Sequence, residues 1–526
     1  MQGKKDYQEE LFTNFQLSEF VPSDNLYRRL KDLLDLDNLY PRTQAYYGTC
    51  GQKSIDPVVF FKLCLIGYLE NIISDRQLMQ HCSMRLDIRF FLNYKLTEPL
   101  PWHSTLSRTR DLLPEELFKE VFEEILAQCV NGGLVSGHTQ VVDSAPVKAN
   151  ASMDSLELKV PASELEEHLS KVRYQSAPDR AKQGPRRKAK QNKASEEQRQ
   201  ITATDRDLKE LKARNKNWQK SQDQRPGARR ENSKYTSNKT HYSPTDPDAR
   251  ISVKPGKARK LNYLSQLAVD PATHIITHIG ADYADKHDSR CLPDIVEALE
   301  GRLHKMGLLF TRLLADTGYS SGENYALLES KGIDAYIPPH GTYKGGPEGF
   351  TYHEQGDYWL CRNNQMVTYR KTFIEKRGNN KKKLYLTKPS QCKGCPFAKS
   401  CIGKSPERRI TITYYREHYE RIKAKLATPE GRRMKSKRQS VVEPVFGVLT
   451  QFMGMRKLYT KGIRNANKQM LMAAAAYNLK KLLKHAKPPI KSVANSKVLS
   501  QSRQALEIVI YYQVLRRFKH PELMLI

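Results

Sequence analysis

The apolar positions between residues 308 and 337 predict a strand, a helix and a second strand. Leu308–Ala315 is an apolar run with the length of a buried strand. Ser320 and Glu323 have the spacing of a capping box that opens a helix, and Ile333–Ile337 is the second strand. Asp316 directly follows the first strand, at the edge where open α/β sheets bind ligands. Asp316 is therefore a candidate functional residue; its alternative role is that of a turn residue or a helix-start charge.

Earlier segments extend this unit into a sheet. Thr139–Asp143 is a strand candidate that also ends in an aspartate. Leu261–Val269 and His274–Ile279 alternate as a hairpin, and Ser289–Met306 has the pattern of an amphipathic helix. A three-stranded meander followed by alternating helix and strand is the order expected of an RNase H-like sheet. We therefore predict an α/β fold, with an RNase H-like mixed sheet and flanking helices, preceded by an all-helical domain and interrupted by insertions.

The chain begins with a helical region. Asp56 and Pro57 form a helix start, and Val58–Ile72 is apolar over most of its surface. Further short helices follow up to residue 131 and carry several basic side chains: Arg85, Arg89, Arg108 and Arg110. Such helices suit DNA contact of the helix-turn-helix kind, and a purely structural helical domain is the alternative.

Shifts in composition divide the chain into domains. Residues 1–133 form the helical N-terminal domain, which we expect to bind DNA, and residues 134–485 form the α/β domain. A basic, partly helical insertion at 153–245 and a cysteine-bearing insertion at 340–410 interrupt the α/β domain. Residues 486–526 are a C-terminal tail. The basic side chains of this insertion either contact the phosphates of nucleic acid along their length, or the insertion is a solvated spacer.

The charge of the chain points to a polyanionic partner. The 526 residues include 88 Lys and Arg against 57 Asp and Glu, which gives a formal net charge of +31. Such an excess favours nucleic acid as the partner. The N-terminal residues MQGKKDYQEE lack the apolar core of a signal peptide, and the apolar run Val58–Leu69 is too short to cross a bilayer. We expect a cytoplasmic protein with no membrane partner.

Four of the nine cysteines are clustered. Cys361, Cys392, Cys395 and Cys401 combine a CxxC pair with two further thiols, a spacing that allows a tetrahedral zinc site. Reduced free thiols are the alternative. The remaining five are scattered and are expected as small core residues: Cys50, Cys64, Cys82, Cys129 and Cys291.

A third carboxylate joins Asp143 and Asp316 as a candidate. Glu443 lies beside an apolar stripe that includes Val442 and Leu449, and Pro444 indicates that a helix begins or kinks there. Cleavage of a phosphodiester by two divalent metal ions needs such oxygen ligands, and Mg²⁺ prefers them. With 57 acidic residues in the chain, spacing alone does not single out these three.

Three segments carry a resemblance to a known family: VVDSAPVKANAS around Asp143, LLADTGYSSGENYALLESKGIDAYIP around Asp316, and KRQSVVEPVFGVLTQFMGMRKLY around Glu443. The chain resembles the bacterial insertion-sequence transposases of the DDE type, in the branch with a helical N-terminal domain and a cysteine-bearing insertion. The resemblance covers roughly residues 15–485. It implies a metal-dependent RNase H-like nuclease and strand transferase with two Mg²⁺ ions, for which Mn²⁺ can substitute. Asp143 would bind both ions, and Asp316 and Glu443 one each.

The resemblance also implies a DNA partner and residues that contact it. Arg438 matches the basic residue of the family and would contact the scissile phosphate; a plain surface arginine is the alternative. Lys148 and Lys461 are further candidates, although Lys461 stands where the family usually has arginine and Thr450 where it usually has lysine. The implied partners are double-stranded DNA, as terminal inverted repeats and target, and a second copy of the chain in a homodimer at the nucleoid. A DNA-binding regulator without cleavage and a nuclease without strand transfer remain alternatives.

Overall fold

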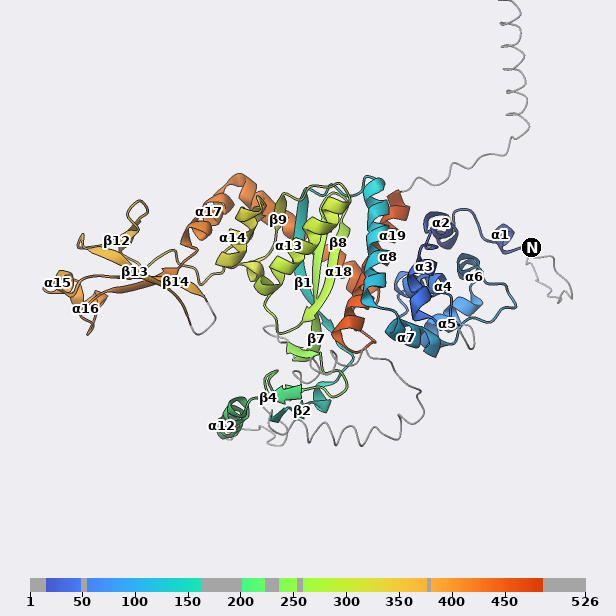
Figure 1. Cartoon of the computed structure of the whole chain (residues 1–526), viewed down its shortest axis with the longest axis horizontal. Helices are drawn as coiled ribbons and strands as arrows, with labels where there is room; N and C mark the ends of the chain where they lie inside the picture. The colour runs from blue at the N-terminus through green and yellow to red at the C-terminus, as the bar shows by residue number, and fades with distance from the viewer. Residues whose placement is uncertain are drawn as a thin grey trace, which may run out of the picture. The chain divides into compact units, whose positions relative to one another are not determined.

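The computed structural model describes residues 16–48, 54–161, 201–222, 236–252, 259–375 and 380–485 (Figure 1). The chain divides into two compact units, Met1–Leu482 and Leu483–Ile526, and all contacts discussed below lie within the first. Cys50 and the tail after residue 485 lie outside the described residues, as does most of the basic insertion.

A mixed sheet forms the centre of the α/β domain. Strands β1 (Thr139–Lys148), β7 (Lys260–Asp270) and β8 (Ile275–Tyr283) run antiparallel in sequence order. Strands β9 (Arg312–Leu314) and β10 (Asp334–Tyr336) continue the sheet on the other side of β1, parallel to it. The meander followed by parallel strands confirms the mixed α/β sheet predicted from the sequence. A short strand, β6 (Arg250–Ser252), pairs with the first residues of β7.

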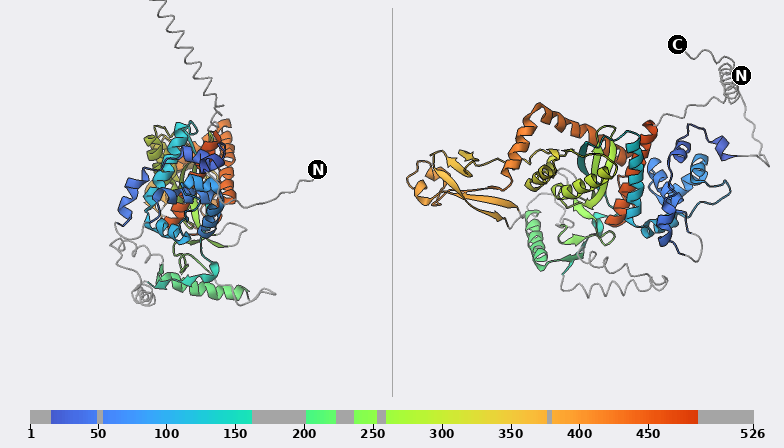
Figure 2. Two further views of the ribbon diagram at one scale, coloured as in Figure 1. Left: turned by 90° about the vertical axis from the view of Figure 1, so that its right-hand side faces the viewer. Right: turned by 45° about the horizontal axis from the view of Figure 1, so that its top comes forward.

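Helices cover both faces of this sheet (Figure 1 and Figure 2). Helices α13 (Asp288–Lys305), α14 (Gly322–Ser330) and α17 (Arg416–Ala427) share one apolar cluster with Val142 of β1 and Leu313 of β9. Helices α8 (Glu115–Asn131), α18 (Pro429–Phe452) and α19 (Ile463–His485) contact the sheet through other residues. Because side chains alternate along a strand, Val141 and Asp143 face away from the cluster that holds Val142. That is the face on which α18 contacts β1.

The N-terminal region is helical, as predicted, with short helices before α8: α1 (Leu17–Phe20), α2 (Leu26–Leu33), α3 (Leu39–Thr43), α4 (Pro57–Leu69), α5 (Asp75–Met84), α6 (Leu86–Leu92) and α7 (His103–Leu112). Asp56 caps α4 by accepting the backbone N–H groups of Val58 and Val59, as the sequence predicts. The rings of Phe60, Phe61 and Phe118 pack edge to face at centroid distances of 5.0–6.0 Å. Aromatic packing thereby joins α4 to α8.

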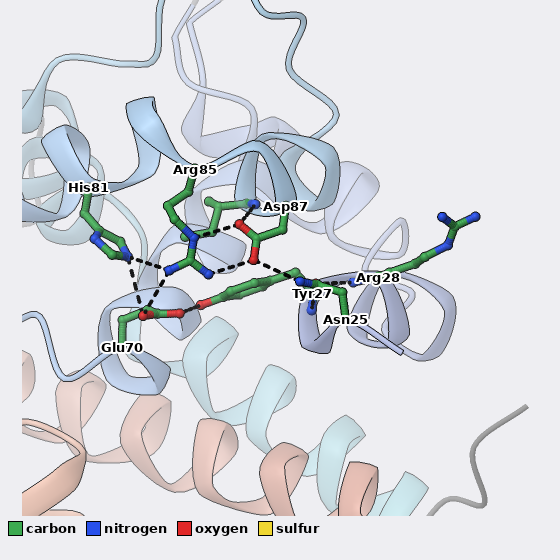
Figure 3. A network of polar contacts seen from close by, with 8 residues as sticks. Asn25, Tyr27, Arg28, Glu70, His81, Arg85 and Asp87 are labelled. Atoms are coloured by element: carbon green, nitrogen blue, oxygen red, sulfur yellow. Dashed lines mark hydrogen bonds and ion pairs between the residues drawn. The ribbon is translucent and has the colours of Figure 1, made fainter. Parts of the chain in front are cut away.

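A polar network connects α2, α5 and α6 and occupies Arg85 (Figure 3). The Arg85 guanidinium donates to both carboxylate oxygens of Asp87, at 2.8 and 2.7 Å, and lies 3.7 Å from the Glu70 carboxylate. Glu70 in turn accepts the Tyr27 hydroxyl at 2.6 Å. Arg85 therefore links helices of this domain to one another.

Two more of the four arginines proposed for DNA contact have internal partners. Arg89 is buried and donates to the backbone carbonyls of Ser83 and Lys95. Arg110 forms a two-bond pair with Asp75, at 2.9 and 3.1 Å. The contacts of Arg85, Arg89 and Arg110 therefore support a structural role for these side chains within the helical domain. Arg108 is exposed and donates to Ser104.

The cysteine-bearing insertion contains a second sheet that the sequence did not predict. Strands β11 to β15 follow one another as an antiparallel sheet, in the order of the chain: β11 (Phe350–His353), β12 (Tyr358–Cys361), β13 (Met366–Ile374), β14 (Lys381–Leu386) and β15 (Arg409–Thr413). Its core is small, with Trp359, Val367, Tyr385 and Ile410. Since most of its other side chains are only half-buried and few are fully buried, the strands lack a clear buried face that periodicity could reveal.

The basic insertion is described in part. Helix α12 (Asp205–Gln222) includes most of the helix predicted at Ala203–Arg214 but begins two residues later, since Ala203 belongs to a short strand. The helix predicted at Ser163–Val172 lies outside the described residues. Two short strand pairs, β2 (Glu157–Leu158) with β5 (His241–Tyr242) and β3 (Val160–Pro161) with β4 (Thr202–Ala203), border it. Across the described ranges, the helices are too short or too polar to cross a bilayer.

Candidate catalytic site

The register of the parallel strands places Asp143 beside Asp316. The last pair between β1 and β9 joins Val141 to Leu314, and each aspartate lies two residues further along its chain. Neighbouring strands are about 4.8 Å apart, and residues two apart share a face. The sequence predicted that the strand ends at Asp143, and this is wrong, because β1 continues to pair with β7 as far as Lys148. The strand end before Asp316 is confirmed.

A tight turn holds the Asp316 carboxylate. Asp316 Oδ1 accepts the backbone N–H of Gly318 at 2.8 Å and thereby caps the 3-10 turn Thr317–Tyr319. Helix α14 then begins with Ser321 as its cap, whose hydroxyl accepts the N–H of Asn324. The prediction that Ser320 caps this helix is wrong by one position. The Ser320 hydroxyl instead accepts the N–H of His340 at 3.2 Å.

Arg438 of α18 pairs directly with Asp143. Arg438 Nη1 donates to Asp143 Oδ2 at 2.7 Å, and each side chain is 18% exposed. The pKa of Asp143 is raised to about 6, chiefly by burial and also by the charges of Asp316 and Asp288, while Arg438 and the N–H of Ser144 act in the opposite direction. A carboxylate that titrates near neutral pH inside an acidic group is typical of functional sites.

Asp288 is the acidic residue that the sequence analysis missed. It is the first residue of α13, and its Oδ1 accepts Gln266 Nε2 at 3.3 Å. A Cβ atom placed on Gly318 would lie 3.0 Å from both Asp288 Oδ2 and Asp316 Oδ1, so the two carboxylates flank this glycine. Burial raises the pKa of Asp288, and the charge of Asp316 adds to this. In the sequence, Asp288 has only the signature of a helix-start charge, so no local signal identified it.

Glu443 occupies a different position from the aspartates. Of the two alternatives at Pro444, a helix start or a kink, the start is wrong, because helix α18 runs continuously through this residue. Thr428 caps α18 by accepting the N–H of Gly431 at 3.0 Å. Val442 is buried as predicted, and the adjacent Glu443 is exposed. Within the described chain, the Glu443 carboxylate takes part in no hydrogen bond or ion pair. Arg438 and Val442 are four residues apart on the face that packs against β1, and Glu443 is rotated about 100° from Val442.

The two predicted DNA-binding lysines lie away from the acidic residues. Lys148 is five residues after Asp143, so it faces the other side of β1 about 17 Å along the strand. Its carbonyl accepts the N–H of Leu458 at 2.8 Å. Lys461 is exposed just before α19 and lines a cavity of about 590 Å³ together with residues of α4, α5 and α7.

The four clustered cysteines meet in the insertion. Cys361, Cys392, Cys395 and Cys401 all line one cavity of about 220 Å³. Gly394 has a φ of 75°, which allows the tight turn between Cys392 and Cys395. Burial raises the pKa of Cys401, as do the other three thiols, and Arg408 lowers it. The four other cysteines in the described chain are buried, as predicted: Cys64, Cys82, Cys129 and Cys291.

Neither cluster is arranged as a metal centre. Among the described residues, no group of three or more His, Cys, Asp or Glu side chains is positioned to hold a metal ion. At the acidic site the reason is visible, because Arg438 neutralises Asp143 and Glu443 faces solvent. The donor types nevertheless fit: carboxylate oxygens suit Mg²⁺, and four thiols suit zinc.

Two families match parts of the chain. Residues 15–112 match a transposase domain (DUF772), and residues 360–483 match a transposase DDE domain. The second match includes Arg438, Glu443 and the clustered cysteines, whereas Asp143 and Asp316 lie outside both. No curated protein matches the chain.

These two matches to transposase domains, together with the mixed sheet, support a DNA transposase. The two families together support an insertion-sequence transposase of the DDE type, which confirms the resemblance drawn from the sequence. Transposases act on DNA, and those of the DDE type generally use divalent metal ions.

Proposed function

We propose that this protein is an active transposase that binds the terminal inverted repeats of its insertion sequence, cleaves the DNA ends and transfers them to target DNA. One observation carries the proposal. The pairing of Val141 with Leu314 places Asp143 next to Asp316, and Arg438 contacts Asp143 at 2.7 Å. A pair of acids with an adjacent guanidinium combines metal ligands with a phosphate-binding group.

The metal ligands proposed are Asp143, Asp316 and Glu443. Two bound Mg²⁺ ions, or Mn²⁺ in their place, would activate the attacking oxygen and stabilise the leaving oxygen. Asp288 adds a fourth carboxylate beside Asp316. Exposure leaves the Glu443 side chain free to change rotamer, and its place on α18 is one turn beyond Arg438.

Arg438 has one role when the site is free of DNA and another when DNA is bound. Without DNA, its guanidinium neutralises Asp143. A phosphate offers the same guanidinium a competing anion with suitable bidentate geometry. We propose that Arg438 contacts the scissile phosphate when DNA is bound, which leaves Asp143 available as a ligand.

A plasmid assay tests the proposal and separates it from its alternatives. Supercoiled plasmid is incubated with the protein, Mg²⁺ and DNA that carries the element's ends. Joined products support the transposase. Nicks without joining favour a nuclease, and binding without either product favours a regulatory protein derived from a transposase.

The proposed DNA interface is electrostatic in large part. Binding to the inverted repeats should weaken steeply as salt rises, because a chain with a net charge of +31 releases counterions from the phosphates. Synapsis of two ends would bring two copies of the chain together as a homodimer at the nucleoid. A flat salt response would count against phosphate-driven binding.

We also propose that the four clustered cysteines bind one structural zinc ion. All four line the same small cavity, in an insertion whose apolar core is only a few residues. A domain with so small a core commonly needs a metal or cross-links for stability. Cys361, Cys392, Cys395 and Cys401 would be the ligands.

A further inference from the structure

A basic cleft begins where the acidic group ends. It has a volume of about 840 Å³ and lies between α14 and strands β14 and β15 of the cysteine-bearing insertion. One wall includes Ser289 and the segment Ser320–Glu323. Ser289 directly follows Asp288, and Ser320 comes four residues after Asp316. A DNA strand that passes the acidic residues and follows this wall would therefore enter the cleft.

The side chains of the cleft are strongly cationic. Six cations line it against one acidic residue, Glu323: Lys344, Lys381, Lys382, Arg408, Arg409 and Arg416. By contrast, the 590 Å³ cavity near Lys461 has both charges, with Arg110 paired to Asp75. The charge of the basic cleft selects a polyanion.

Three of these cations carry no ion pair in the described chain: Lys344, Lys381 and Arg409. Lys344 and Arg409 are exposed, and the half-buried Lys381 ammonium lies over the Tyr414 ring, 3.9 Å from its centroid. Lys382 is paired with Glu375 at 2.8 Å. Arg416 stabilises the wall itself, because it stacks on Tyr352 at 4.1 Å.

The cleft is preformed and narrow. A Cβ atom on Gly322 would overlap the Tyr415 ring, so only glycine allows this close approach of α14. Tyr343 and Tyr419 stack on each other at 4.3 Å, and Tyr343 donates to Glu420 at 2.7 Å. The volume is that of pockets that hold single small ligands, roughly 300–1,000 Å³. A space of this volume accommodates a few nucleotides of one strand and is too small to enclose a duplex.

We propose that the basic cleft binds a short unpaired DNA strand next to the scissile phosphate, with Lys344, Lys381 and Arg409 on its phosphates. The cleft would hold the strand that separates from its complement at the cleaved end. The statement that this strand lies next to the scissile phosphate rests on the proposed function. The statement that the cleft binds single-stranded DNA does not.

Fluorescence anisotropy without added Mg²⁺ or chelator tests the binding without cleavage and leaves the proposed structural zinc in place. The full-length protein is titrated with a blunt duplex and with the same duplex carrying an oligothymidine tail. We expect tighter binding of the tailed duplex. The triple variant Lys344→Gln, Lys381→Gln, Arg409→Gln should lose this preference, and its salt slope for the tailed duplex should fall by about 2, since each single-strand phosphate contact contributes about 0.7.

A matched variant controls for net charge. Lys119→Gln, Lys305→Gln and Lys480→Gln removes three exposed cations outside the cleft and should keep the tail preference. If the triple cleft variant does not fold, the pair Lys344→Gln, Arg409→Gln, both exposed, takes its place.

Photocrosslinking gives a second readout. A 4-thiothymidine in the tail should crosslink to peptides of β14, β15 or the segment around Lys344. Equal binding of tailed and blunt duplexes, a tail preference that survives the cleft substitutions, or crosslinks elsewhere would overturn the inference. Plasmid cleavage and joining can succeed in each of these cases, so failure of the cleft proposal is distinguishable from failure of the proposed function.

Discussion

Arg438 on α18 donates to Asp143 on β1 across 295 positions of sequence, at 2.7 Å. This contact joins the helix that carries Glu443 to the strand that carries the first acidic candidate. It also opposes the effect of burial on Asp143, because the guanidinium favours the ionised carboxylate and burial, the larger effect, favours the neutral form.

Asp143→Asn, Asp316→Asn and Glu443→Gln should each abolish plasmid cleavage and leave duplex binding intact. Loss of one metal ligand removes several kcal/mol of transition-state stabilisation, which means a rate reduction of more than about a hundredfold. Gel-based cleavage assays and anisotropy measure the two properties separately. Retained cleavage in any variant removes that residue from the site, and this is the most direct test of Glu443.

Cleavage should depend on pH with a midpoint near 6. The folded-state pKa of Asp143 is raised to about 6, so the carboxylate is mostly protonated below this value and ionised above it. Only the ionised form is a metal ligand, so the rate should fall as pH falls through about 6. Because metal binding favours the ionised form, more Mg²⁺ should move the midpoint to lower pH. A midpoint near 4 at low Mg²⁺ would contradict the burial of Asp143.

Neighbouring residues should move this midpoint in opposite directions. Arg438 lowers the pKa of Asp143 and Asp288 raises it. Arg438→Ala should therefore shift the midpoint to higher pH, and Asp288→Asn should shift it to lower pH. Arg438→Lys is the control that keeps the charge. An unchanged midpoint in both variants would mean that the group that titrates is not Asp143.

The insertion should contain zinc. Metal analysis of the purified protein is expected to give one zinc ion per chain, and Cys392→Ser with Cys395→Ser should remove it and expose the insertion to proteolysis. Cys64→Ser changes a buried cysteine outside the cluster and should leave the zinc content unchanged. A metal-free wild-type protein with a resistant insertion would support the alternative of free thiols.

Arg110→Ala should destabilise the helical domain. Its side chain is only 12% exposed and pairs with Asp75 at 2.9 Å, so its removal leaves a partly buried carboxylate without a partner. The expected loss is about 3 kcal/mol, at the lower end for a broken buried pair. Arg108→Ala, at an exposed site, should have little effect on thermal unfolding. The opposite result, normal stability with weakened DNA binding, would restore a DNA-contact role for Arg110.

The sequence by itself determined the order of the main elements and the position of Asp316 after its strand. Alternation and apolar runs are local signals, so the hairpin of β7 and β8, helix α13 and the strand before Asp316 followed from them. The insertion sheet did not, because most of its strand positions are only half-buried and its core is small.

Only the tertiary structure decided which residues meet. The parallel pairing of β1 with β9 brings Asp143 to Asp316, and the start of α13 adds Asp288. Packing also gave Arg85 and Arg110 internal partners and left Glu443 on the exposed side of α18. The physical reason is the same in each case: contacts between residues far apart in the chain depend on strand register and helix rotation, which no short stretch of sequence encodes.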